Sequence, residues 1–538
     1  MTTPSGAATA VAHMYEDTGS RKHAKGQSSA GSDIAQQRGN MRHVAQLGIS
    51  AFALLASACG GGAASEPDGS PDGGLPVEAG SDSGAPGDAD RDADPPDDSG
   101  PADPDAGPPR PWDVVPTVVG TAQAVSPGIA GPLFPFAVLP FDDRVFIVGE
   151  ARADLRWGTE VFPSGGYLLA VDAATGALLF HRALGDAVYG IARYGSDVVI
   201  AGAFIHPMTL ARASGGPIEL VSLGATDGFV ARMSRDGDVQ WATSFGSGGF
   251  DHAFDVHTSG ERILIAGALR GDWVGCGGTL RPHPGVVDPF EGRVIGAQDA
   301  LLVELDPSGA CVDASVIGHA GTDEFALHVL ATDGAVFVSG EGGGPLVRRS
   351  VSGDEHLIGE QAGGWLVRVG EDGTHDVWSV GSAATRGSRG RGLGVGGDQL
   401  YFSFTSEGGN LLHGDEVVGT VERGVGVMRL SLTDGAITHW ALGRGTLDTI
   451  DLAISNGGIV IPATGADPSH IQVALLEGEI LRSFRNDVIA SYPYVVAADG
   501  GTVWMAGSAG ADSIVLGVDE VEVSLGPQGG LFLVRLDL

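Results

Sequence analysis

Short apolar runs with a period of two residues fill residues 113–538. Val, Ile, Leu and Phe alternate there with small or polar residues, and turns that contain Gly separate the runs. This alternation is typical of β-strands, and the period of 3.6 residues that marks an amphipathic helix is missing from this region of the sequence. The pattern therefore predicts an all-β body.

The predicted strands form two repeating units that alternate along the chain. The first unit is a pair of strands joined by a turn with Gly. Its turn glycines are Gly176, Gly237, Gly309, Gly373, Gly435 and Gly478. The second unit is a hairpin whose second strand ends in a small residue and Gly, as at Gly149, Gly202, Gly267, Gly340 and Gly507. Residues 400–406 and 459–465 take the same place without that Gly, so we count seven second units.

One strand is left over at the C-terminal end, at residues 531–536, because the chain opens with a second unit at 136–149. An unpaired edge strand invites aggregation. Pairing it with residues 117–123 completes a seventh repeat of four strands. The sequence thus predicts a seven-bladed β-propeller at 113–538, closed by its N- and C-terminal strands.

The third repeat carries a family resemblance. It reads Asp227-Gly228-Phe229-Val230-Ala231-Arg232, then Asp236-Gly237, Trp241, Phe245-Gly246, Asp251 and Ala266-Gly267. This series resembles the β-propeller repeat of bacterial secreted proteins and lipoproteins. The resemblance extends over 113–538 and implies the fold and a place outside the cytoplasm, but no reaction.

An export signal is predicted ahead of this body. The apolar run 47–58 follows Met41-Arg42-His43 and has about a dozen residues, whereas a membrane span needs roughly 20. Its length suits a signal peptide at 41–58. We interpret residues 1–40 as a disordered leader, or as sequence upstream of the true start at Met41.

The string Leu55-Ala56-Ser57-Ala58-Cys59 resembles the lipobox of bacterial lipoproteins. The resemblance implies that Cys59 is acylated and becomes the mature N-terminus, although Ala56 stands where Leu is commoner. An ordinary signal peptide cut near Ala58, or a short buried helix, is the alternative. By the same resemblance, Gly60 after the Cys favours the outer membrane of a Gram-negative bacterium.

Residues 59–112 are predicted to be a disordered linker. From residue 60 onward Gly, Ser, Ala, Pro and Asp dominate, with 13 acidic residues against Arg91 and Arg110. Such a segment cannot bury enough apolar surface to offset its ordering entropy. It is expected to act as an extended spacer.

The overall charge excludes one class of partner. The chain has 67 acidic and 31 basic residues, a formal net charge of −36, and its only lysines are Lys22 and Lys25. Nucleic-acid binding needs a basic face, so we exclude it.

Two cysteines remain in the body, Cys276 and Cys311. An exported protein meets an oxidising compartment, which favours a disulfide between them over two buried thiols. The bond would close a loop of 35 residues.

Two groups of polar residues are candidate sites. Acidic residues recur just before the second unit and serve either as turn hydrogen-bond acceptors, which we favour, or as a cation site at a rim. These are Asp186, Asp251, Asp323 and Asp448. Arg386, Arg389 and Arg391 form either a rim clamp for a carboxylate or a sulfated glycan, or a solvated loop.

Residues 170–176 with Phe180 are similar to the repeat of quinone-dependent dehydrogenases, in which the last position is a docking Trp. Trp241 also suits that position. We interpret both as a Gly turn with a packing aromatic ring, because a set of calcium and quinone ligands is not evident. The histidines lack zinc-like spacing, and we expect no metal and no cofactor.

The sequence favours a membrane-anchored surface or periplasmic lipoprotein. Its propeller is expected to be a non-catalytic module that binds a protein or glycan at a rim. Two alternatives stay open, a carbohydrate-active or quinone-dependent enzyme and an envelope-assembly scaffold.

Overall fold

The computed structural model describes only part of the chain, and all of that part belongs to one compact unit, Phe52–Leu538. The described residues are 117–124, 133–287, 294–295, 298–359, 363–381, 388–444, 448–449, 451–455, 458–464, 471–477, 480–486, 492–509, 513–516, 521–525 and 529–537. The predicted leader, signal peptide, lipidated Cys59 and linker lie outside them. Every regular element in these ranges is a β-strand. None of the described residues belongs to a helix long and apolar enough to span a membrane.

Four-stranded antiparallel sets follow one another along the chain. The first contains β2 (Leu133–Phe141), β3 (Arg144–Ala151), β6 (Gly165–Asp172) and β7 (Leu178–Ala183). The second contains β8 (Ala187–Tyr194), β9 (Asp197–Phe204), β12 (Asp227–Ser234) and β13 (Val239–Phe245). The third contains β14 (His252–Ser259), β15 (Arg262–Leu269), β20 (Asp299–Leu305) and β21 (Cys311–Gly318).

The same order continues in the C-terminal half. The fourth set contains β22 (Phe325–Thr332), β23 (Ala335–Glu341), β26 (Gly364–Gly370) and β27 (His375–Gly381). The fifth contains β28 (Arg389–Gly396), β29 (Gln399–His413), β30 (Glu416–Ser431) and β31 (Ile437–Arg444). The sixth contains the short β32 (Asp448–Thr449) and β33 (Ala453–Ser455), then β34 (Gly458–Thr464), β35 (Ile471–Glu477) and β36 (Ile480–Asn486).

The last set joins the two ends of the body. It contains β37 (Tyr492–Asp499), β38 (Thr502–Ala509), β41 (Gly530–Asp537) and, from the other end of the chain, β1 (Thr117–Ala124). Strands β1 and β41 run antiparallel, with Thr121 opposite Phe532 and Gln123 opposite Gly530. This is the pairing that the leftover strand predicts.

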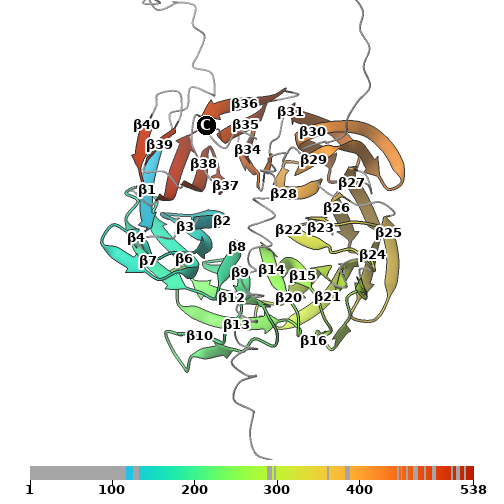
Figure 1. Ribbon diagram of the computed structural model, residues 1–538, viewed down its shortest axis with the longest axis horizontal. Helices are drawn as coiled ribbons and strands as arrows, with labels where there is room; N and C mark the ends of the chain where they lie inside the picture. Colours follow the sequence, from blue (N-terminus) through green and yellow to red (C-terminus); the bar gives the residue numbers. More distant parts are fainter. Residues whose placement is uncertain are drawn as a thin grey trace, which may run out of the picture. The chain divides into compact units, whose positions relative to one another are not determined.

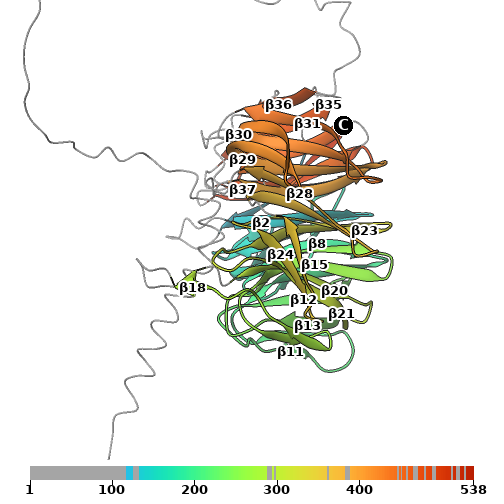
Figure 2. The ribbon, with the colours of Figure 1, turned by 90° about the vertical axis from the view of Figure 1, so that its right-hand side faces the viewer.

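The sets lie around a common centre, which is the arrangement of a β-propeller (Figure 1). The first strand of each set contacts the first strand of the next, from β2 through β8, β14, β22, β28 and β33 to β37, and β37 contacts β2. Figure 2 shows these sets from the side. Apolar side chains fill the space between neighbouring sets. Phe146 and Leu168 of the first set, for example, share one buried cluster with Val198 and Phe229 of the second.

Small hairpins are inserted between the second and third strands of a set. We call these segments the insertions. Three of them pair with the outer strand of the preceding set and so cover its edge. They are β4 (Leu155–Trp157) with β5 (Glu160–Phe162), β24 (Leu346–Ser350) with β25 (Glu355–Gly359), and the outer halves of β29 and β30. The other hairpins are β10 (Met208–Leu210) with β11 (Ile218–Leu220), β16 (Trp273–Gly275) with β17 (Gly278–Leu280), β18 (Val286–Val287) with β19 (Val294–Ile295), and β39 (Ser513–Leu516) with β40 (Val521–Ser524).

The outer strands dock on the next set through aromatic rings. A Cβ added to Gly237 would lie 2.7 Å from the ring of Phe180, and one added to Gly309 would lie 2.7 Å from Trp241. The Trp241 indole N–H also donates to the carbonyl of Pro307 at 3.0 Å. Phe180 and Trp241 are therefore packing residues between sets, as we interpret them from the sequence.

Candidate binding site at the centre of the sheets

We call the first strand of each set its inner strand. The inner strands begin at the same end of the molecule's centre from which the insertions leave. The start of the inner strand lies beside the end of the second strand, as in the pairs of Leu133 with Ala151 and Phe325 with Glu341. The insertions leave from the ends of those second strands. We call this end of the centre the insertion face.

A β-bulge recurs at the same place in the inner strands. The register shifts lie between Pro135 and Ala137, Val188 and Gly190, Ala253 and Asp255, and Ala326 and His328. The extra residues are therefore Phe136, Tyr189, Phe254 and Leu327. A bulge turns its side chain out of the normal alternation, and here the repeated bulge brings side chains of neighbouring sets together.

Three of these bulged residues and Phe325, the first residue of β22, form a continuous line of rings near the insertion face. We call it the aromatic row: Phe136, Tyr189, Phe254 and Phe325. Neighbouring ring centroids are 4.9, 5.4 and 6.3 Å apart along this row. These separations lie within the range of favourable aromatic contacts. Tyr189 and Phe254 are buried, whereas Phe136 and Phe325 are half-buried.

His252 adds a neutral ring to this row. It stacks on Phe254 with centroids 5.1 Å apart, and burial lowers its pKa to about 4. It therefore carries no charge at neutral pH. The row as a whole offers apolar and aromatic surface, which suits aromatic, aliphatic or sugar-ring groups of a partner.

A second layer of side chains lies one residue after the bulge. The carboxylate of Asp255 accepts the N–H of Val256 at 2.8 Å and that of Val329, on the next inner strand, at 3.0 Å. Asp451 does the same with Leu452 at 2.8 Å and Val496 at 3.1 Å. Each carboxylate thus ties one set to the following one.

His328 occupies the corresponding position on β22, with Nδ1 3.6 Å from the Asp255 carboxylate. Burial alone would lower the pKa of His328, but the carboxylate of Asp255 and the charge of Asp451 raise it above the usual value, against the opposing charge of Arg391. Burial also raises the pKa of Asp451 to about 6, although His328 partly offsets this. The charges of Asp255, His328 and Asp451 thus partly compensate one another where the sets meet.

Two of the three arginines predicted to form a clamp or a loop lie on a strand. Arg389 and Arg391 are both on β28, where Arg389 forms an ion pair with Glu341 at 3.0 Å and Arg391 is 7% exposed. Arg391 lies in the bulge of β28, the position that holds the ring in other sets. Arg386 lies outside the described residues, so the clamp of three arginines stays a prediction.

The recurring acids mostly accept hydrogen bonds from nearby backbone. Asp186 accepts the N–H of Ile205 at 2.6 Å, and Asp251 accepts that of Arg270 at 2.7 Å. In the fourth set this position belongs to Glu324, which accepts the N–H of His319 at 3.3 Å, while Asp323 is exposed. The side chain of Asp448 lies outside the described residues.

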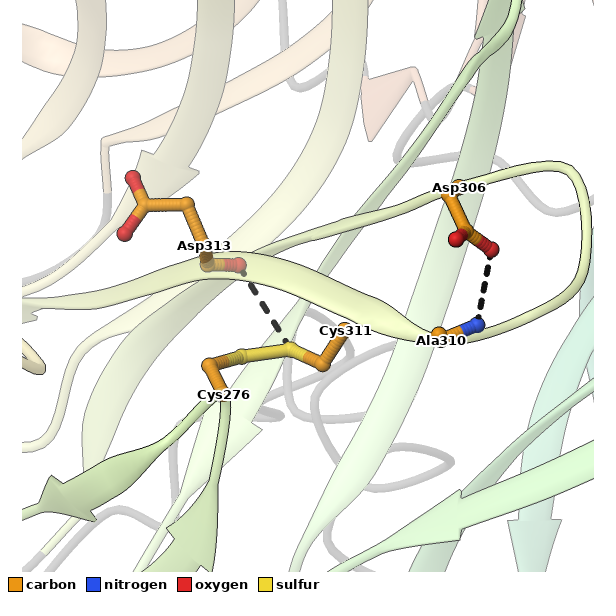
Figure 3. Close-up of a disulfide and its surroundings, with 5 residues drawn as sticks. All are labelled: Cys276, Asp306, Ala310, Cys311 and Asp313. Carbon is orange, nitrogen blue, oxygen red and sulfur yellow. Dashed lines mark hydrogen bonds between the residues drawn. A yellow bond between two sulfur atoms is a disulfide. The ribbon is translucent and has the colours of Figure 1, made fainter. Parts of the chain in front are cut away.

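Cys276 and Cys311 form a disulfide in the structure (Figure 3). The bond joins the turn of the β16–β17 hairpin to the start of β21, with the Cα atoms 4.9 Å apart. It therefore fixes an insertion of the third set onto that set's outer strand.

Among the described residues, no three His, Cys, Asp or Glu side chains form a group that could hold a metal ion. The sequence analysis missed the aromatic row and the two bridging aspartates. Aligning the inner strands would have placed Tyr189, Phe254 and Leu327 at one register and Asp255 and His328 at the next. The bulge itself leaves no separate signal in the alternation.

No known protein family profile matches the chain, and no curated protein matches it either. Solved structures resemble it only distantly. The computationally designed Ika8 protein aligns with a TM-score of 0.33 and 10% identity over 76% of this chain and 99% of its own. BamB from Moraxella catarrhalis aligns with a TM-score of 0.37 and 11% identity over 78% of this chain and 100% of its own. A putative 6-phosphogluconolactonase from Bacteroides uniformis aligns with a TM-score of 0.34 and 15% identity over 65% and 83%.

Proposed function

We propose that this chain is an exported, lipid-anchored binding protein whose seven-bladed β-propeller holds a protein or glycan partner at the insertion face. The aromatic row carries this proposal. Four neighbouring sets each contribute a ring to this row. Binding sites concentrate where loops and aromatic groups meet on a rigid scaffold.

The closed propeller of this proposal has seven blades, one for each four-stranded set. Two observations support it. The contacts between inner strands return from β37 to β2, and β1 supplies the outer strand of the set that β41 belongs to. Closure would hold the rings of the aromatic row at fixed separations, which lowers the entropy lost on binding.

The anchor rests on the lipobox-like string that ends in Cys59. Acylation there, with the acidic linker behind it, would place the propeller away from a membrane of the envelope, with the outer membrane favoured by Gly60. Metabolic labelling with an alkyne fatty acid tests the anchor. We expect label on the wild type and none on Cys59→Ser, and equal labelling of the two would overturn it.

Site-specific photo-crosslinking in the native envelope tests the binding proposal. A benzophenone amino acid replaces Phe136, which is half-buried in the aromatic row, and in a matched control replaces Leu179, which is 44% exposed on the outer strand β7. We expect a discrete crosslinked partner from position 136 that is missing from position 179. Crosslinks of equal yield and size from both positions, or none from position 136, would contradict the proposal.

The envelope-assembly alternative is a special case of this experiment, because a membrane barrel protein would then be the crosslinked partner. The catalytic alternative needs carboxylates that are available to a substrate near the centre of the sheets. In the layer that follows the bulges, the carboxylates of Asp255 and Asp451 accept hydrogen bonds from backbone N–H groups of adjacent sets. The binding proposal therefore agrees better with their geometry.

A further inference from the structure

At one junction between sets, the turn glycine has no neighbour packed against it. Gly237, Gly309 and Gly435 each face an aromatic ring of the preceding set, and an added Cβ would lie 2.7 Å from Phe180, Trp241 or Trp378. Gly176 faces the backbone of Val119. Gly373 belongs to the same series, but a Cβ added there would meet nothing within 4 Å. Among the described glycines of this series (Gly176, Gly237, Gly309, Gly373 and Gly435), Gly373 alone is open.

The cause is a single replacement on β21. Trp241 pairs with Arg232 across the second set, and Phe180 pairs with Ala170 across the first. The same register position in the third set is held by Asp313, which pairs with Glu304. A short acidic side chain therefore stands where the neighbouring sets hold a large ring, two residues after Cys311 on the strand drawn in Figure 3.

A cavity of about 250 Å³ occupies the vacated place between the third and fourth sets. Its apolar wall comes from both sets: Leu264, Leu302, Val336 and Val369. An apolar cavity of about 150 Å³ is enough to hold benzene, so this one has room for a larger ring such as indole. The space matches the side chain that the repeat has lost.

The polar edge of the cavity favours a positive charge. Arg262 already donates to both oxygens of Glu304, at 3.0 and 2.8 Å. Arg348 donates to Ser315 Oγ at 3.1 Å. Two carboxylates are held only loosely, since Asp313 lies 3.9 Å from Arg348 and Glu371 lies 4.0 Å from Arg262.

Both of these carboxylates are also more than half exposed, so each can turn toward a ligand. With Glu304 included, three acids face two arginines in this lining. The remaining negative charge complements a cation.

We propose that this cavity is a binding site for a small aromatic amine. The aromatic ring lies against the apolar wall in the place of the missing docking ring, and the ammonium group faces Asp313 and Glu371. The site is separate from the aromatic row, and it does not depend on the function proposed above.

Calorimetric titration of the full chain with tryptamine, indole and indole-3-acetate tests this site. These three probes share the ring and differ in charge. We expect tryptamine to bind at least about tenfold more tightly than indole, and indole-3-acetate to bind least. An absence of binding by tryptamine, or equal binding of all three probes, would overturn the proposal.

Variants then connect the binding to the cavity. Asp313→Ala keeps the space and removes the carboxylate, so tryptamine is expected to fall to the affinity of indole. Asp313→Trp restores the repeat's own ring, and we expect it to bind neither probe and to melt at a higher temperature. Val369→Phe fills the cavity from the other wall and gives the same test if Asp313→Trp does not fold.

Asp272→Ala is the matched control, because Asp272 is another exposed acid of the third set, 63% exposed and paired with Arg281. It should bind tryptamine as the wild type does. Wild-type affinity in both cavity-filling variants would place any binding elsewhere and would contradict the proposal.

Discussion

At the scale of single residues, buried carboxyl groups decide how the protein responds to pH. Glu324 is fully buried, and burial raises its pKa to about 9, with a further contribution from the charge of Asp299. An added Cβ at Gly318 would lie within 2.9 Å of both carboxyl groups, so the two acids face each other. Glu324 is therefore protonated at neutral pH.

The raised pKa of Glu324 predicts a loss of stability at high pH. The folded state holds this proton more tightly than the unfolded state, so stability falls as pH rises from the ordinary value of 4.5 toward about 9. Glu324→Gln keeps the shape without the charge. We expect the variant to be more stable than wild type at pH 8, by more than about 1 kcal/mol, since one pKa unit corresponds to about 1.4 kcal/mol.

Urea unfolding at pH 5 and pH 8 measures this effect. At pH 5 the two proteins should differ little, because this pH is close to the ordinary pKa of 4.5 and the unfolded wild type gains little by releasing the proton. Asp323→Asn is the control at the adjacent, exposed position, and it should change the pH dependence much less, because the charge of Asp323 is the smallest of the causes that shift the pKa of Glu324. If Glu324→Gln and wild type lose the same free energy of unfolding between pH 5 and pH 8, the raised pKa of Glu324 is contradicted.

Residue identity alone did not predict which polar groups face the centre. Arg389 and Arg391 are recognisable in the sequence as a basic group, but the sequence cannot show that one pairs with Glu341 and the other lies in a bulge. Both facts depend on which strands are neighbours. The turn role of Asp251 was predicted better, because the hydrogen bond that it accepts from the Ser247 N–H is local.

At the scale of elements, the docking of outer strands on turn glycines gives a matched comparison. Gly309 and Gly373 have nearly the same backbone conformation, with φ of 83° and 81°. A Cβ at Gly309 meets Trp241 at 2.7 Å, whereas a Cβ at Gly373 meets nothing. Substitution by Ala costs both sites the strain of a positive φ, roughly 1–2 kcal/mol.

We expect Gly309→Ala to lose about 1–3 kcal/mol more than Gly373→Ala, because only the first displaces a packed ring. Denaturant unfolding of the two variants side by side gives the difference directly. Equal losses would mean that the Trp241 ring does not dock on Gly309.

The disulfide is a second element-scale test, since it joins the β16–β17 hairpin to β21. We expect no reactive thiol in denatured, unreduced Cys59→Ser protein, where Cys276 and Cys311 are the only cysteines left. Reduction should lower the free energy of unfolding by about 3–4 kcal/mol in the chain-entropy account of a 35-residue loop.

The double variant Cys276→Ser/Cys311→Ser is the control, and it should not respond to reductant. Two reactive thiols in the unreduced protein would show that the cysteines are free.

Strands and turns were the part of the fold that the sequence could predict. Alternation and Gly turns locate the strand pairs, as in β12 and β13 around Gly237, because both signals are local. The short hairpins were not foreseen as edge covers. The pairing of β24 with β21 joins residues of different sets, and no local sequence pattern indicates it.

At the scale of the whole molecule, the account depends on the two ends of the body. β1 pairs with β41 on one side and with the hairpin strand β4 on the other, so it is not an edge strand of its sheet. Its burial pattern agrees with this, since Ala122 is fully buried between the first and last sets. The proposed seven-bladed ring depends on this pairing of the two ends.

Amide hydrogen exchange of the intact chain, followed by mass spectrometry, tests this closure most directly. The account predicts that peptides covering Thr117–Ala124 are protected to the same extent as peptides covering β41, and lose protection together with them as denaturant is added. Exchange of Thr117–Ala124 at the rate of an unfolded chain, while β38 and β41 stay protected, would show that the ring is not closed by these two strands.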